Sequence, residues 1–249
     1  MKVPFLDSFM EQEELIKSAY DFYEKMKNDE NWRYRSWEHC YYIFSQARKT
    51  GTPDIELLCL HLSFYLASWG MYRGSSFLLQ KDYLVHKHAV ETILNEKYNC
   101  LIGCNVDTLN ENLGLLFALS EELKTIYDRI REQVCAEMGR DNPVMPVSDT
   151  LITKILLGTL GCVPAYDRFF IEGIKDTKTA NSQFNCKSME KIIKHYKENE
   201  KFYEPIREKM VVKECCCYPP MKVVDMVFWN YGYKKRLEQK TNRKAKNGK

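Results

Sequence analysis

Residues 148–174 read SDTLITKILLGTLGCVPAYDRFFIEGI, and this stretch decides the fold. Ser148 or Asp149 can cap a helix, because a side-chain oxygen at that position accepts a hydrogen bond from an unpaired amide of the first turn. Apolar residues then recur at helical spacing, at Leu151, Ile152, Ile155, Leu156 and Leu160. The pattern predicts a helix that places these residues in the core.

The second half of the stretch predicts a turn and a second helix. Gly158 and Gly161 loosen the end of the first helix, and Pro164 prevents the chain before it from continuing as a helix. Pro164 also suits the first turn of the following helix. Asp167 then lies within about one turn of a helix N-terminus, where the helix dipole favours the ionised carboxylate by ~0.3–1 kcal/mol. The alternative is an ordinary helix-start residue that pairs with Arg168 or another neighbour.

The remaining chain has the same helical character. With 11 Gly and 8 Pro in 249 residues, turns are scarce, and a composition of 45% hydrophobic and 29% charged residues is globular. Apolar helical patterns cover residues 5–28, 36–50, 54–72, 77–94, 109–138, 189–200, 202–209 and 220–239. Residues 54–72 are apolar on nearly all sides, so we expect them to form the central buried helix. Residues 211–218, VVKECCCY, are the only strand candidate. The sequence therefore predicts an all-α fold.

Charge is divided unevenly along the chain. Residues 234–249 contain eight Lys or Arg and one Glu, whereas the rest contains 33 acidic and 29 basic residues. We expect a single helical domain over residues 1–233, in one or two lobes with a link near residues 139–147, followed by a basic flexible tail over residues 234–249. Such a tail attracts phosphates without reading sequence, or is simply solvated.

The sequence lacks the usual signals for export, membrane insertion and metal binding. The N-terminus has no signal-peptide core and no apolar run is long enough to cross a membrane, so we expect a cytoplasmic protein without a membrane partner. Most of the ten cysteines lie in apolar helical patterns and are expected to be reduced. The Cys100-x3-Cys104 pair has no second pair at zinc spacing, and the consecutive Cys215-Cys216-Cys217 point in different directions, so we expect no metal and no cofactor.

Two short segments are candidate sites in addition to Asp167. Residues 68–77, SWGMYRGSSF, form an elbow between apolar helices, in which Arg73, Ser75 and Ser76 can present an Arg fork and polar groups to a phosphate. The alternative is a packed tight turn. Arg33 and His39 have a spacing that resembles the Arg…His signature of the helical HEPN ribonucleases. The alternative is that Arg33 is a solvated surface residue and that His39 packs against its neighbours without a catalytic role.

A longer resemblance covers about a tenth of the chain. The segment TKILLGTLGCVPAYDRFF resembles the part of helix–hairpin–helix DNA glycosylases in which an apolar helix and an apolar-Pro-apolar run precede the catalytic aspartate. The matching residues are Lys154, Ile155, Leu156, Leu157, Val163, Pro164, Ala165, Tyr166 and Asp167. The family's Gly-rich hairpin motif is absent, and Gly158 to Gly161 lies too close to Asp167 to replace it. The four-cysteine iron–sulfur pattern of some members is also absent.

The resemblance implies a helix–hairpin–helix glycosylase-like fold and a chemistry. Asp167 would stabilise the positive charge that develops on the sugar as the N-glycosidic bond breaks, and Lys154 would contact substrate. Tyr72 and Tyr166 would line a pocket for the flipped base, with Arg73, Ser75 and Ser76 as hydrogen-bond donors. The partner would be DNA, including phage DNA with modified bases, because the family includes bacterial defence enzymes that excise them.

A different class of function fits the same residues. The chain has no complete catalytic motif, so a non-enzymatic helical binding module, such as an antitoxin or a defence-complex subunit, is the alternative. That alternative predicts that Asp167 is engaged in a helix cap or an ion pair, without an open pocket beside it.

Overall fold

A computed structural model describes residues 4–139, 146–213 and 216–247, with side chains described from residue 11 to residue 241 within those ranges. The α-helices are α1 (Pro4–Lys27), α2 (Ser36–Thr50), α3 (Ile55–Ser68), α4 (Lys87–Ile93), α5 (Val106–Glu111), α6 (Leu113–Glu137), α7 (Asp149–Thr159), α8 (Arg168–Asp176), α9 (Cys186–Glu198), α10 (Glu200–Arg207) and α11 (Pro220–Asn247). Short 3-10 helices are η1 (Arg33–Arg35), η2 (Phe77–Gln80), η3 (Tyr83–His86) and η4 (Glu96–Leu101). The all-α fold is confirmed.

The strand prediction is also confirmed, at small scale. β1 (Val211–Val212) and β2 (Cys216–Cys217) pair antiparallel, with Val211 opposite Cys217 and Val212 opposite Cys216. None of the described helices combines the length and the apolar character that a membrane span requires.

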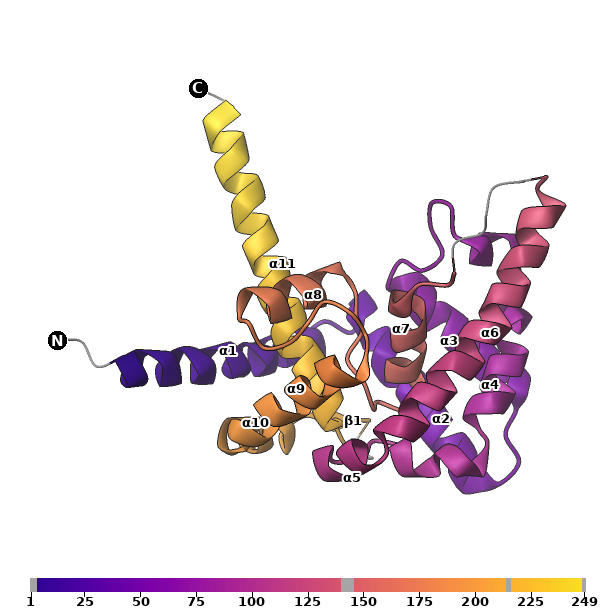
Figure 1. Cartoon of the computed structure of the whole chain (residues 1–249), viewed down its shortest axis with the longest axis horizontal. Helices are drawn as coiled ribbons and strands as arrows, with labels where there is room; N and C mark the ends of the chain where they lie inside the picture. Colours follow the sequence, from indigo (N-terminus) through magenta and orange to yellow (C-terminus); the bar gives the residue numbers. More distant parts are fainter. Residues whose placement is uncertain (1–3, 140–145, 214–215, 248–249) are drawn as a thin grey trace.

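The helices fall into two groups that lie side by side (Figure 1). One group contains α2, α3, α4, α6 and α7, and the other contains α1, α8, α9, α10 and α11. The first helix of the chain therefore packs against the last one, because the inner part of α1 contacts α11. The chain crosses between the groups twice, through η1 between α1 and α2, and in the link between α7 and α8, which carries the predicted site. The outer parts of α1 and α11 extend away from both groups (Figure 1).

The most deeply buried helix is α7. Every residue from 151 to 166 is buried, and α7 is packed against α2, α3 and α6. Gly158 permits this packing, because a Cβ at that position would lie 2.5 Å from the Tyr65 ring of α3. The expectation that residues 54–72 form the central buried helix is wrong. Leu57, Leu60 and Phe64 of α3 are 39–59% exposed along one stripe, so apolar composition alone did not determine burial.

Close packing of α8 on α11 depends on two glycines. A Cβ on Gly173 would clash with the carbonyl oxygen of Phe228, and a Cβ on Gly232 would clash with the carbonyl oxygen of Phe169. Each glycine therefore lets the other helix's backbone approach, and together they fix the distance between α8 and α11.

Helix ends follow the capping pattern in most places. Ser148 caps α7 by accepting from the Leu151 amide, and Gly51 ends α2 with φ of 70°. Two expectations are corrected. Pro164 lies in the extended link and not in the first turn of α8, which begins at Arg168. Residues 234–247 continue α11 as a helix where an irregular tail was expected, because their Lys, Arg, Gln and Ala residues favour helix and no Gly or Pro interrupts them.

Candidate functional site

The link between α7 and α8 holds Asp167 through hydrogen bonds to both helix groups. Within the link, the Tyr166 amide donates to Thr153 Oγ1 at 2.9 Å, and Thr150 Oγ1 donates to the Tyr166 carbonyl at 2.8 Å. The Ala165 amide donates to Asp225 Oδ1 of α11 at 3.0 Å. The backbone that leads into Asp167 is therefore fastened to α7 on one side and to α11 on the other.

Asp167 is the N-cap of α8, as its position at a predicted helix entrance indicated. Its Oδ1 accepts from the amides of Phe169 at 3.0 Å and Phe170 at 3.1 Å. Its Oδ2 accepts from Lys154 Nζ at 3.2 Å and from Trp229 Nε1 at 3.2 Å. A carboxylate has about four lone-pair positions, so these four donors satisfy it. The side chain is 15% exposed.

Lys154 is a buried cation with one acidic partner. Its side chain is 3% exposed, and besides Asp167 it donates to the Trp69 carbonyl oxygen at 3.4 Å. The ammonium also lies 5.0 Å from the centre of the Trp69 ring. Burial lowers the pKa of Lys154 below its usual value, and Asp167 offsets only part of that effect. A lysine in this setting releases its proton more readily than one in water.

A second buried ion pair lies close by, and the sequence analysis did not single it out. Lys222 Nζ and Asp225 Oδ2 of α11 are 2.9 Å apart, with side chains 6% and 4% exposed. The Lys222 ammonium lies 5.5 Å from the Trp69 ring centre, so this indole contacts both buried cations. The signal was present, because a Lys and an Asp three residues apart interrupt an otherwise apolar stretch that begins at Pro219.

Aromatic rings cover the site from several helices. Trp69 and Trp229 have ring centroids 5.6 Å apart, and Tyr34 of η1 contacts both, at 5.0 and 5.5 Å. The cluster is completed by Phe22, Trp32, Phe169 and Tyr233. The Trp69 Nε1 hydrogen is buried without a partner among the described residues. The site is thus an acid–base pair set among rings at the junction of the two helix groups.

The other predicted substrate-binding residues lie elsewhere. The Tyr72 hydroxyl bonds to Ser63 Oγ at 3.2 Å and to His86 Nε2 at 2.8 Å, on the inner side of α3. Tyr166 is 1% exposed, and its hydroxyl donates to Ser188 Oγ at 2.9 Å. Both side chains face the core and not the surroundings of Asp167.

The first residues of the elbow (68–77) lie beside the Asp167 site, whereas its last residues lie away from it. Trp69 contacts Lys154, and the exposed guanidinium of Arg73 lies against Gly70. Ser75 and Ser76 instead line a small hollow of about 140 Å³ with Arg131. Among the described residues, Asp167 lines neither this hollow nor the two larger ones described below.

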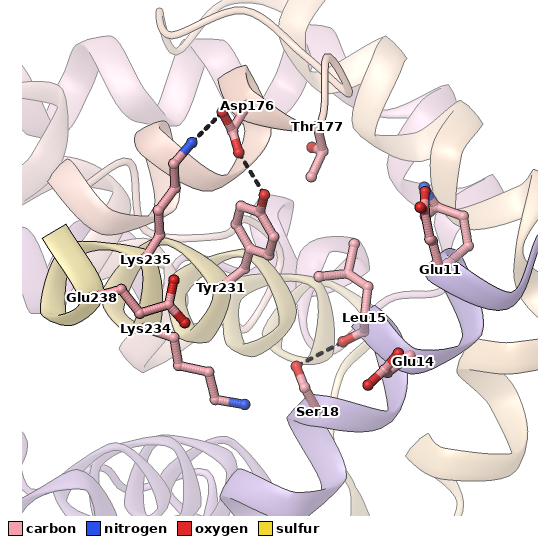
Figure 2. Close-up of a pocket in the computed structure, with 11 residues that line it drawn as sticks. Glu11, Glu14, Leu15, Ser18, Asp176, Thr177, Tyr231, Lys234, Lys235 and Glu238 are labelled. Carbon is pink, nitrogen blue, oxygen red and sulfur yellow. Dashed lines mark hydrogen bonds and ion pairs between the residues drawn. The ribbon is translucent and has the colours of Figure 1, made fainter. Parts of the chain in front are cut away.

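The largest of these hollows lies between α1, the end of α8 and α11, and has a volume of about 790 Å³ (Figure 2). Asp176 is paired there with Lys235 and with the Tyr231 hydroxyl. The carboxylate raises the pKa of Tyr231 to about 12, and Lys235 and Tyr231 lower the pKa of Asp176. Glu11 and Glu14 of α1 line the opposite side. The lining has four acidic side chains, with Glu238 as the fourth, against only Lys234 and Lys235, so this hollow has a net negative charge and does not favour anions.

Arg33 and His39 are not joined by a hydrogen bond or ring contact in the described structure. Arg33 donates to the Tyr34 hydroxyl at 3.0 Å. His39 is half-buried on α2, and burial, Lys213 and Arg35 lower its pKa. The ribonuclease interpretation stays a prediction from spacing. The described residues contain no group of three or more His, Cys, Asp or Glu side chains placed to hold a metal ion.

Comparisons of the chain with protein-family models, with curated proteins and with solved structures find no match.

Proposed function

We propose that the protein is a DNA glycosylase-like hydrolase in which Asp167 acts on the sugar. The observation that supports this proposal is the 3.2 Å pair of Asp167 and Lys154, set among indole rings where the two helix groups meet. A carboxylate at a helix N-terminus suits a centre that becomes positively charged, and a lysine with a lowered pKa suits proton donation. The resemblance of the segment around Asp167 points to the same chemistry.

In the proposed reaction the two residues have separate tasks. The N-glycosidic bond breaks, its electron pair goes to the base, and Lys154 gives the departing base a proton. Asp167 stabilises the cationic sugar and accepts a proton from the water that adds to C1′. The base must leave the DNA stack, and the Trp69 and Trp229 rings are surfaces on which it can stack.

Substrate entry requires a local rearrangement. The four acceptor positions of Asp167 are occupied by two amides, Lys154 and Trp229. The amides belong to the cap of α8, so the group that moves is the Trp229 indole or the Lys154 ammonium. We propose that the substrate is DNA with a modified base, bound in part by the basic end of α11, because lysines and arginines there attract phosphates.

The test is release of bases from DNA. Duplexes that carry unmodified or modified bases are incubated with wild type, Asp167→Asn and Asp176→Asn, and abasic sites are counted by alkaline cleavage. Asn keeps the shape and capping ability of Asp167 and removes its charge, so we expect a loss of about 10²-fold or more. Asp176→Asn is the matched control and should retain activity. Equal activity of wild type and Asp167→Asn would remove the assigned role.

One observation favours a second function, a non-enzymatic helical binding module. The carboxylate of Asp167 is fully hydrogen-bonded, which is what a purely structural residue requires. In that case wild type releases no base from any duplex of the panel, while Asp167→Asn lowers the melting temperature. Base release by wild type at a rate that depends on Asp167 would contradict it.

A further inference from the structure

A second hollow, of about 520 Å³, is lined mainly by basic side chains. Lys27 of α1, Arg35 of η1 and Lys209 and Lys213 beside β1 line it, together with Tyr23, Glu24 and Val211. Glu24 is the only acidic residue of the lining. These residues are far apart in the sequence, so the cationic cluster is created by the packing of α1 against the segment that follows α10.

Most of the positive charge has no acidic partner in the described structure. Lys27 pairs at 2.9 Å with Glu38, which is 1% exposed and also accepts from the Tyr218 hydroxyl. The Arg35 guanidinium forms no hydrogen bond or ion pair with the residues described, and its Nε is buried without a partner. After Glu24 and Glu38 are each set against one cation, two positive charges remain.

The two lysines near β1 are held by rings and not by carboxylates. The Lys209 ammonium lies 5.9 Å from the Tyr20 ring centre, and the Lys213 ammonium lies 4.7 Å from the Tyr42 ring centre. Neither forms an ion pair with a described carboxylate. Lys213 also has φ of 42°, in the left-handed region that glycine normally occupies. The chain thus places a lysine at the edge of this hollow in a backbone conformation that disfavours any side chain.

The hollow adjoins the Asp167 site through η1. Two consecutive residues of η1 face different surroundings, since Tyr34 belongs to the aromatic cluster and Arg35 lines the hollow. Any group bound in the hollow is therefore one residue along the backbone from a ring that contacts Trp69 and Trp229.

We propose that this hollow binds a phosphate group. An Arg fork with free N–H groups and lysine ammoniums without carboxylate partners suit the oxygens of a phosphate, whereas a neutral or cationic ligand would leave the surplus charge unmatched. The phosphate belongs either to a nucleic-acid backbone or to a free phosphorylated compound, and the chemistry of recognition is the same. This site is distinct from Asp167, and its function does not depend on base release.

The test compares wild type with Arg35→Met, Lys213→Met and the control Lys194→Met. Lys194 is 74% exposed on α9 and lies outside the hollow. Titration calorimetry with pyrophosphate at low salt measures binding of free phosphate groups. Fluorescence anisotropy with an unmodified 12-base-pair duplex over a range of salt concentrations measures binding of backbone phosphate. Melting temperatures verify that each variant is folded.

We expect the two hollow variants to weaken pyrophosphate binding at least tenfold and Lys194→Met to leave it unchanged. If the phosphate comes from DNA, each hollow variant also lowers the slope of log affinity against log salt by about one. If it is a free compound, the slope stays at the wild-type value. Pyrophosphate and duplex binding that are both unchanged in the hollow variants, or absent in wild type, would overturn the proposal. Asp167→Asn should bind both probes normally, which separates this test from that of base release.

Discussion

Lys154 and Asp167 form an ion pair across the link that joins α7 to α8, with side chains only 3% and 15% exposed. Breaking one half of a buried pair leaves an uncompensated charge, at a typical cost of about 3–5 kcal/mol. We therefore expect Lys154→Met to lower the free energy of unfolding by about that amount, measured by urea denaturation. The double variant Lys154→Met/Asp167→Asn should regain part of the loss. A double variant less stable than Lys154→Met would show that Asp167 is held mainly by its other donors.

The glycine contacts between α8 and α11 give a prediction about packing. Gly173→Ala and Gly232→Ala each place a Cβ against a carbonyl oxygen of the other helix, so we expect each to lower the free energy of unfolding by about 1–3 kcal/mol. The control is Gly114→Ala in α6, where a Cβ meets no atom within 4 Å. That change should be neutral or stabilising by up to about 1 kcal/mol. Thermal or urea denaturation measures all three, and equal effects would contradict the role of close approach.

The buried histidine predicts a pH dependence of stability. His86 is enclosed between the Tyr72 and Tyr127 hydroxyls, at 2.8 and 2.6 Å, and burial lowers its pKa to about 3. In the unfolded chain an imidazole has a pKa of about 6.5. Between these values the unfolded state binds the extra proton, so stability falls as pH falls from about 6.5 toward 3, by up to about 1.4 kcal/mol per pH unit.

The measurement is the free energy of unfolding in urea at several pH values from 7 to 4.5. His86→Gln keeps hydrogen-bonding capacity and cannot titrate, so its stability should depend less steeply on pH than that of wild type. His88→Gln changes a histidine whose side chain is 78% exposed, and it should keep the wild-type slope. Parallel curves for wild type and His86→Gln would contradict the assignment.

The basic end of α11 predicts a dependence of DNA binding on ionic strength. Ending the chain after Tyr233 removes eight Lys or Arg and one Glu. Among residues 234–241, the part of this segment whose burial is described, most are exposed, so we expect the melting temperature to change little. The slope of log affinity against log salt for a duplex should decrease by several units, measured by fluorescence anisotropy. An unchanged slope would place the DNA-binding surface elsewhere.

Local features of the fold were predictable because they depend on neighbouring residues. Ser148 and Gly51 mark helix ends by capping chemistry, and Asp167 is found at the entrance of the second apolar helix. The apolar periodicity also identified the core-facing residues of α7. Such features need only the chemistry of a few consecutive residues.

Burial and partnership were harder to predict, because they are set by contacts between distant segments. The mostly apolar α3 leaves one stripe exposed, whereas α7, with a lysine and three threonines, is buried at every residue from 151 to its end. The partners of Asp167 illustrate the same point, since Trp229 is 62 residues away in the chain. Nothing near Asp167 in the sequence indicates that an indole from α11 covers it. Tyr72 and Tyr166 were expected beside a pocket, but each finds a hydrogen-bond partner inside the core.

The continuity of α11 has a mechanical consequence. One unbroken helix carries Lys222, Asp225 and Trp229 in its buried half and the basic residues in its outer half. Each residue of an α-helix is fixed in rotation and rise relative to the next, by about 100° and 1.5 Å. A shift of the outer half about the contact of Gly232 with α8 would therefore also move Trp229, the indole that covers Asp167. A displacement of the basic end, for example by a bound partner, would be transmitted along the helix itself to the Asp167 carboxylate.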